Sequence, residues 1–332
     1  MSEQCNEIVI SSRVRLARNY HDLPFSNLDA PDNAHACVER ARAALAEDGE
    51  RSYRLFLLAD MPKVERLKLM EKHLVSLDLL RHSDVGAALI RDDEAVCVMV
   101  NEEDHLRIQA MLRGLALTQA AELAFAAEEK LQRSCEFSFD SQLGYLTACP
   151  TNTGTGMRAS LMLHLPLLTR RKQMGAVGQT VAKLGLTIRG IYGEGSDALG
   201  ELYQVSNQVT LGRTEKEIGD AVLAVGKQLI DMESALREQE RTEQRLMLED
   251  RVFRSYALMR YARSMDDNEF MRLWSDLRLG ASQGLIPVAL ETCDELLTVA
   301  QDAHVKRYQQ SHDIEGDVES ARCDMLRERL DA

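Results

Sequence analysis

One segment of the 332-residue chain combines most of the side-chain types that phosphate chemistry needs. It runs from Cys149 to Arg158 with the sequence CPTNTGTGMR, so a thiol, hydroxyls, an amide, two glycines and a guanidinium share one expected loop. Backbone N–H groups can turn inward in such a loop, and the arginine adds a planar fork of donors, a combination that suits phosphate oxygens. A structural turn beside a chance arginine is the alternative interpretation.

Four other arginines also stand in unusual local sequence. Arg13 and Arg15 alternate in SSRVR, which sends both side chains to the same face if the segment is extended. Arg107 follows the acidic sequence NEEDHL, and Arg189 opens RGIYGEG. A polyphosphate with about four negative charges needs several cations, and guanidinium groups bind its oxygens bidentately. For any one of these arginines alone, a surface salt bridge is the ordinary explanation.

Carboxylates and one thiol supply the second component of a possible site. Glu103 lies in an acidic triplet, and Glu194 stands between two glycines. The two could face each other across a pocket and grip a cationic substrate, although an acidic triplet also suits a solvated turn or a helix N-terminus. Cys149 is either an inert buried thiol or, near arginines, a thiolate that helps to bind a cation.

Histidines and composition narrow the possibilities further. His73 and His105 have no second ligand at helical spacing, so no metal site is predicted, while His73 could contact a nucleotide. The seven cysteines are odd in number and form no CxxC pair, which favours a reducing cytosol. Because no apolar run is long enough to span a bilayer, we expect a cytoplasmic protein. The net charge of −13 disfavours nucleic acid and favours cationic partners, although solubility explains such a charge equally well.

The periodicity of the chain predicts an α+β fold with an antiparallel β-sheet flanked by helices, followed by an all-α C-terminal domain. The expected strands are 96–100, 136–145 and 205–211, and the expected helices are 32–47, 62–80 and 106–132. After Thr214 an apolar stripe predicts a long helix. The charged segment 237–254 reads as a solvated helix that links two units. We expect two domains, 1–236 and 237–332, the second regulatory or dimerising.

These segments together resemble the ATP:guanido phosphotransferases, the superfamily of arginine and creatine kinases. Four ordered motifs carry the resemblance: SSRVRLAR from Ser11, NEEDHLR from Asn101, CPTN with GTGMRAS from Cys149, and RG with GE from Arg189. The small-molecule kinases of this superfamily carry a helical domain before the first motif, which we expect to be absent here. A helical domain after the motifs, together with YLT before Cys149, resembles the bacterial protein-arginine kinases. The resemblance covers nearly the whole chain.

The resemblance implies a role for each matching residue. It assigns the nucleotide clamp to five arginines: Arg13, Arg15, Arg107, Arg158 and Arg189. It places the backbone of these further residues along the ATP site: Ser11, Ser12, Val14, Ala159, Ser160, Leu161, Met162, Gly190, Ile191, Tyr192, Gly193 and Glu194. His73 is expected near the same site. Glu103 and Glu194 are the expected carboxylate pair, with Glu103 as general base, and Cys149 is the reactive thiol. ATP and Mg²⁺ are the expected cofactors, with Mg²⁺ held chiefly by nucleotide phosphates and water.

The implied function is transfer of the ATP γ-phosphoryl group to arginine side chains of proteins, marking them for quality control and degradation. Implied partners are arginine-presenting proteins, a separate activator protein, a Clp-type protease and a second copy of the chain, paired through Leu273, Trp274 and Leu277. A kinase for a small guanidine and a non-catalytic adaptor for arginine-rich clients are the alternatives. One departure concerns a C-terminal Arg-Asp-x-x-Arg-Ala motif that binds phosphoarginine in this branch. The corresponding stretch here, from Val318 to Cys323, keeps only Arg322, which we expect to be exposed and to bind phosphoarginine weakly.

Overall fold

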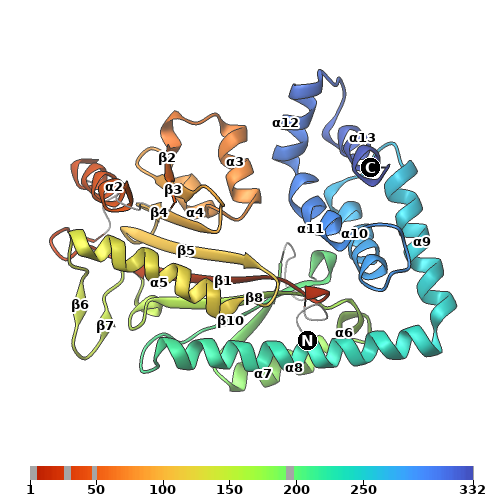
Figure 1. Ribbon diagram of the computed structural model, residues 1–332, viewed down its shortest axis with the longest axis horizontal. Coiled ribbons are helices and arrows are strands. Elements are labelled where there is room, and N and C mark those ends of the chain that lie inside the picture. Colours follow the sequence, from red (N-terminus) through yellow and green to blue (C-terminus); the bar gives the residue numbers. More distant parts are fainter. Residues whose placement is uncertain (1–5, 26–30, 47–50, 192–197, 332) are drawn as a thin grey trace.

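A central antiparallel sheet organises the fold in the computed structural model, which describes residues 6–25, 31–46, 51–191 and 198–331. Its eight strands lie in the order β2-β3-β4-β5-β1-β8-β10-β9 (Figure 1). The strands are β1 (Val9–Arg18), β2 (Tyr53–Leu57), β3 (Ala87–Arg91), β4 (Val96–Val100), β5 (Leu106–Arg113), β8 (Met157–His164), β9 (Leu186–Gly190) and β10 (Leu202–Asn207). The antiparallel α+β fold expected from periodicity is thereby confirmed.

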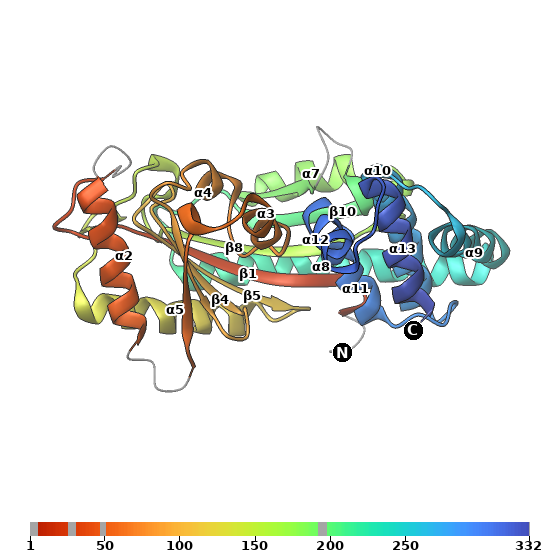
Figure 2. The same ribbon diagram turned by 90° about the horizontal axis from the view of Figure 1, so that it is seen from above.

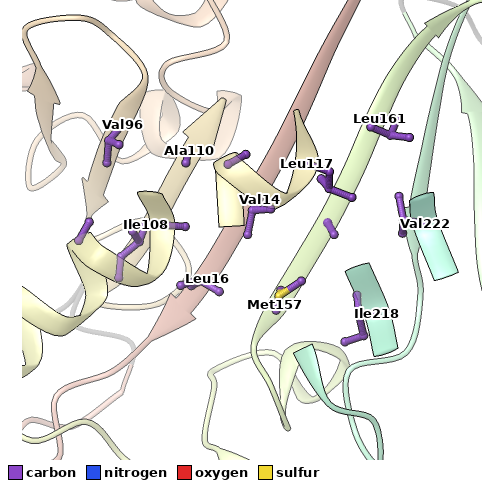
Figure 3. Packing of buried hydrophobic residues seen from close by; sticks show 14 of the residues in the cluster. Val14, Leu16, Val96, Ile108, Ala110, Leu117, Met157, Leu161, Ile218 and Val222 are labelled. Carbon is purple, nitrogen blue, oxygen red and sulfur yellow. The ribbon is translucent and has the colours of Figure 1, made fainter. Parts of the chain in front are cut away.

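Alternation along the strands separates an apolar face from a polar one. On β1, Val14 and Leu16 point into a core that also takes Ile108 from β5 and Leu161 from β8 (Figure 3). Helices α2 (Pro31–Ala46), α5 (Leu117–Ser134) and α8 (Glu215–Glu243) cover this face, and α7 (Met174–Lys183) adds Val177 and Val181 to the same core. Because successive side chains of a strand point to opposite faces, Arg13 and Arg15 of β1 are directed away from this core.

In the described part of the chain, helices cover the opposite face of the sheet at its two ends. Over β2–β4 lie α3 (Lys63–Glu71) and α4 (Leu77–Arg81), packed on a small cluster around Leu58 and Met99. At the other end lie the C-terminal helices α9 (Arg245–Tyr261), α10 (Asp267–Ser282), α11 (Leu290–Val299), α12 (Asp302–His312) and α13 (Val318–Asp331). In both views α3 and α12 lie side by side (Figures 1 and 2). The polar middle of the sheet lies between these two coverings.

A single helix connects the part of the chain that contains the sheet to the C-terminal helices α9–α13. α8 runs under the sheet and continues into the C-terminal helices, so the expected boundary at residue 236 falls inside it (Figure 1). The expectation of a solvated linker after residue 237 is wrong at Arg237 and Glu240, which are buried. Arg237 donates to Glu233 on the same helix at 3.2 Å and to the carbonyl of Glu7 at 3.3 Å. The chain passes between the two parts without an exposed hinge at these residues.

Two further expectations need correction. The segment 106–132 is not one helix, because Leu106, Ile108 and Ala110 alternate into the core as strand β5 before α5 begins at Leu117. Leu273, Trp274 and Leu277 are fully buried in the C-terminal core of the single chain, so they do not present a surface to a second copy. Among the helices in the described ranges, none is sufficiently long and apolar to cross a membrane.

Candidate active site

Four arginines converge on the polar face where β5, β1 and β8 meet. Arg13 and Arg15 alternate on β1, and Arg15 lies directly opposite Arg158 of β8. Arg107 of β5 faces the same side, opposite Ala17 of β1. Arg189 lies on the edge strand β9, opposite Gln204 of β10, which in turn accepts a hydrogen bond from Arg13 at 2.8 Å. The topology therefore gathers on one face arginines that are far apart in sequence.

The pKa values of Arg15 and Arg158 reflect how close the guanidinium groups lie to one another. Burial, and then the positive charges of Arg13, Arg107 and Arg158, lower the pKa of Arg15 well below its ordinary value. Burial and the charges of Arg189 and Arg107 lower the pKa of Arg158. The Nε atoms of Arg15 and Arg158 are buried without a hydrogen-bond partner in the described part of the chain. Like charges with unused donors suit an anion with several oxygens, such as the phosphates of ATP.

Polar neighbours that the sequence analysis did not assign hold these arginines in place. Ser206 accepts from Arg158 at 3.2 Å, and Glu102, which is 3% exposed, accepts from Arg107 at 2.5 Å. Ser206 and Gln204 belong to the polar side of a strand whose period-two pattern was visible in the sequence. That pattern could have identified both residues as lining the site.

The acidic triplet divides into three different roles. Glu102 points inward to Arg107 and also accepts from the hydroxyl of Ser76. Asp104 is buried and accepts from Asn19 and from the backbone N–H of Ala148, each at 2.7 Å, which ties the triplet to the Cys149 segment. Only Glu103 is open to the site, with its side chain 40% exposed and 3.6 Å from Arg107 Nη2. Glu103 is therefore the carboxylate of the triplet that a substrate can reach.

The Cys149 segment lies beside Glu103. Asn152 donates to Glu103 at 3.3 Å, and the Cys149 thiol lies 3.0 Å from the hydroxyl of Thr151. The thiol is partly exposed. Glu103 and Cys149 thus come from two separate segments and meet at the same edge of the arginine cluster.

The expectation that backbone N–H groups of this segment bind phosphate is wrong for most of it. The N–H groups of Asn152, Thr153, Gly154 and Thr155 donate to carbonyls of Cys149, Pro150, Tyr145 and Thr210, respectively. Gly154 has φ of 117°, and a Cβ there would lie 2.4 Å from the Thr210 carbonyl oxygen, so this close approach requires glycine. The segment is a scaffold for Cys149 and Asn152, and these four N–H groups are not available to phosphate.

Several residues whose backbone is expected along the ATP site direct their side chains elsewhere. Val14, Ala159 and Leu161 point into the core under the sheet, and Ser12 is buried, donating to the carbonyl of Gly114 at 2.7 Å. Their main chain pairs with neighbouring strands, so these four residues support the site without facing it. The remaining strand positions are distributed as follows: Ser11 on β1, Ser160 and Met162 on the arginine side of β8, Gly190 at the end of β9, and Ile191 just beyond it.

Two expected site residues remain, His73 and Glu194. His73 follows α3, and its carbonyl accepts from Gln109 of β5 at 2.7 Å. Burial, with a smaller contribution from Arg13, lowers its pKa to about 4, so the ring is neutral near pH 7 and belongs to the surroundings of the arginine cluster. Tyr192, Gly193 and Glu194 lie outside the described residues. The structure therefore brings Glu103, Cys149 and the arginines together, and the position of Glu194 is not described.

The C-terminal stretch that departs from the family motif also differs from expectation. Arg322 is not exposed: it is 1% exposed and donates to the carbonyls of Ala300 and Met265 at 2.8 and 2.7 Å and to Asp302 at 2.6 Å. With its donors used inside the C-terminal domain, this arginine holds α12 and α13 together. It offers no free fork for a phosphoryl group in this arrangement.

Comparison with known proteins agrees with this geometry. The chain belongs to the ATP:guanido phosphotransferase family, because residues 36–236 match the model of the ATP:guanido phosphotransferase C-terminal catalytic domain. Residues 245–332 match the model described as the protein-arginine kinase McsB C-terminal domain. The chain is thus an ATP-dependent phosphotransferase.

Relatives and solved structures match over most of the chain. A protein-arginine kinase of Caldanaerobacter subterraneus subsp. tengcongensis is 43% identical over 310 residues, 92% of each chain. One of Moorella thermoacetica is 47% identical over 284 residues, 84% of this chain and 81% of that protein. Among solved structures, a lombricine kinase is similar with a TM-score of 0.62 and 26% identity, over 70% of this chain and 68% of that one.

Proposed function

We propose that this protein is a protein-arginine kinase, which transfers the γ-phosphoryl group of ATP to arginine side chains of proteins. The observation that carries the proposal is the arginine cluster of β1, β5 and β8, with unused buried donors on Arg15 and Arg158, next to Glu103 and Cys149. The cluster suits the triphosphate, and a carboxylate beside it suits a guanidinium. The names of the similar curated proteins support the same acceptor.

The chemistry requires a base because guanidinium stays protonated near neutral pH and is then a poor nucleophile. Glu103 accepts a proton from the attacking nitrogen as the N–P bond forms and the bond from phosphorus to the leaving oxygen of ADP breaks. The arginines neutralise charge on the phosphoryl oxygens and hold the reacting atoms in line. Mg²⁺ bound to the triphosphate oxygens and water would add further charge neutralisation. Cys149, at the same edge, assists in holding the guanidinium.

Two other functions make different predictions in one experiment. The protein is incubated with MgATP and either free arginine or an unfolded protein such as β-casein, and acid-labile phosphate is measured. We expect phosphate on the arginines of casein, located by mass spectrometry under mild conditions. Rapid labelling of free arginine with none on casein would favour a small-guanidine kinase, and no labelling of either, with casein bound, would favour an adaptor.

We further propose that two copies of the chain pair through α9. One face of this helix is buried against the C-terminal core, yet its other face exposes these apolar side chains: Leu246, Met247, Phe253, Leu258 and Tyr261, which are 46–78% exposed. Two α9 helices can pair antiparallel so that they cross at the level of Val252, which itself faces the core. Asp250 of each copy then lies opposite Arg254 of the other, and Leu246 lies opposite Leu258. This self-complementarity is what a two-fold interface requires.

The proposed arginine phosphorylation also has a cellular role. We propose that arginine phosphorylation marks proteins for a Clp-type protease and that a separate activator protein controls the kinase. The match to the protein-arginine kinase C-terminal domain supports the arginine kinase activity on which this role rests. Incubating casein with the kinase and MgATP, then measuring its degradation by a Clp-type protease, tests the marking. Equal degradation of unphosphorylated casein would contradict it.

A further inference from the structure

The last turn of α3 meets the C-terminal helix α12 on the polar side of the sheet (Figure 1). Glu71, the final residue of α3, accepts hydrogen bonds from the backbone N–H groups of Ala303 and His304 at 2.7 and 3.1 Å. The Nδ1 of His304 lies 2.6 Å from the same carboxylate. The side chains of Glu71 and His304 are largely buried. One carboxylate of the sheet-containing part thus makes three contacts with one helix end of the C-terminal part.

The position of Glu71 is unfavourable for its own helix and favourable for α12. A carboxylate in the last turn of a helix faces the negative end of the helix dipole, whereas a carboxylate at an N-terminus stabilises the helix. The first N–H groups of a helix have no partner inside it, and the N-cap residue of α12, Gln301, supplies no side-chain hydrogen bond. Glu71 therefore caps α12 from a distant part of the chain.

Of the two helices, α12 is held more firmly by its own surroundings. Arg322 of α13 donates to Asp302, in the first turn of α12, at 2.6 Å and to the carbonyl of Ala300 at 2.8 Å. α3 rests on the sheet through the partly buried Leu69 and Met70, and none of its residues, all of which the structure describes, is fully buried. The contact between the two helices therefore positions α3 more than it positions α12.

α3 ends in a left-handed turn that reaches the arginine cluster. His73 has φ of 58°, and the N–H groups of His73 and Leu74 donate to carbonyls in the last turn of α3 at 2.8 and 3.0 Å. These are the two hydrogen bonds of a Schellman motif, so this turn moves together with the end of α3. The carbonyl of His73 accepts from Gln109 of β5 at 2.7 Å, and Gln109 lies directly opposite Arg15 of β1.

We infer that Glu71 is a positioning residue that couples the C-terminal helices to the nucleotide side of the active site. It fixes α3 against α12, and through the turn at His73 it fixes what packs on Gln109 beside Arg15. ATP bound at the arginine cluster should in turn stabilise the contact with α12, because coupling between two sites is reciprocal. The inference rests on the proposed function, in which the arginine cluster binds the triphosphate.

The test compares two carboxylates that each accept two backbone N–H groups. Glu71→Gln removes the charge that caps α12 and keeps an acceptor oxygen, so the variant should fold. Asp140→Asn is the matched control, because Asp140 accepts from the N–H groups of Gln142 and Leu143 at 2.8 and 2.9 Å. These contacts lie within the hairpin 139–145, which is remote from α12 (Figure 1).

Nucleotide affinity is the first measurement. By calorimetry, ATP affinity should fall at least about fivefold in Glu71→Gln, the lower end of typical coupling between two sites, and stay within about twofold of the parent in Asp140→Asn. His304→Gln, which removes the imidazole contact from the side of α12, should lower the affinity less than Glu71→Gln does. This third variant also keeps the test decisive if Glu71→Gln does not fold.

Amide exchange is the second measurement and does not depend on catalysis. In the parent and in Asp140→Asn, saturating MgATP should slow exchange at Ala303 and His304, although α12 lies outside the arginine cluster. In Glu71→Gln this slowing should be lost at saturating MgATP. Exchange at Leu74 without nucleotide should also be faster in Glu71→Gln than in the parent, since the end of α3 is then less firmly held.

The outcomes separate this inference from the proposed function. Parental ATP affinity in Glu71→Gln would overturn the coupling, even if the variant melts at a lower temperature, and so would equal losses in Asp140→Asn. A parent in which MgATP leaves exchange at Ala303 and His304 unchanged would overturn it as well. If the parent binds ATP but does not phosphorylate casein, the proposed function fails, and affinity and exchange still decide the role of Glu71.

Discussion

Arg15 and Arg158 lie directly opposite each other on adjacent antiparallel strands, with the Nε of each buried and unpaired. Like charges in such cross-strand positions destabilise a sheet. The pair is therefore a local weakness of the unliganded protein, and a bound polyphosphate would relieve it. Removing one of the two charges should therefore weaken nucleotide binding and leave the unliganded protein equally or more stable.

Arg15→Gln tests this opposition. We expect nucleotide affinity to fall by at least about tenfold, since a charge-assisted hydrogen bond is worth about 1.5–3 kcal/mol. The melting temperature without nucleotide should stay equal or rise, and the increase that ATP gives to the parent should largely disappear. Arg40→Gln, which removes a surface pair with Asp22, is the matched control and should keep the ATP response. A variant that is less stable without nucleotide and still binds ATP normally would refute the clamp.

Glu103→Gln should keep the fold and ATP affinity and lose most phosphoryl transfer. A positioned base contributes about 10²–10⁴-fold, so kcat should fall within that range. Glu102→Gln is the control, because this buried carboxylate pairs with Arg107 and its loss should weaken ATP binding. Turnover of Glu103→Gln within threefold of the parent would remove Glu103 from the role of base.

Cys149→Ala should lower activity without abolishing it, because the thiol assists in holding the guanidinium and does not carry the phosphoryl group. Iodoacetamide should inactivate the parent, and MgATP should slow the loss. The same reagent should inactivate Cys135→Ala, which keeps Cys149, and should have little further effect on Cys149→Ala. Full activity of a parent alkylated at Cys149, shown by peptide mapping, would make this thiol structural.

Acid should destabilise the protein through His73. Its pKa is about 4 in the folded protein against about 6.5 when unfolded, so the unfolded chain binds the proton first. The contribution of His73 to stability is complete above pH 6.5 and is lost as pH falls towards 4, with a slope of at most about 1.4 kcal/mol per pH unit. His73→Asn, which suits the φ of 58°, should lose less of its free energy of unfolding between pH 7 and 5. Identical pH profiles in urea titrations would contradict the assignment.

Pairing through α9 should be sensitive to one charge on its exposed face. Phe253→Glu should yield monomers in sedimentation velocity at concentrations where the parent is a dimer, because two carboxylates would be brought into an apolar contact. Leu184→Glu, at a similarly exposed leucine of the catalytic part, should leave the dimer intact. A parent that is monomeric, or a Phe253→Glu dimer of unchanged stability, would exclude this surface.

The sequence alone predicts those features of the fold and site that depend on neighbouring residues and on periodic patterns. The alternation of Arg13 and Arg15 predicted their common face, because the period of a strand is short. The residue types of Leu106–Arg113 favour a helix, and the place of this segment between β4 and β1 makes it a strand. Glu102 and Glu103 are adjacent in sequence, yet one is buried against Arg107 and the other faces the site. Such differences depend on residues that approach from distant segments.

The position of β1 in the middle of the sheet has a consequence for synthesis of the protein. This strand leaves the ribosome well before both of its neighbours, β5 and β8. Until residue 164 has emerged, at least one edge of an apolar strand containing Val9, Val14 and Leu16 stays unpaired. Closing such distant pairings is slow, and unpaired edges aggregate readily. The nascent chain should therefore depend on a holding chaperone over this interval, more than a protein whose first strand lies at an edge.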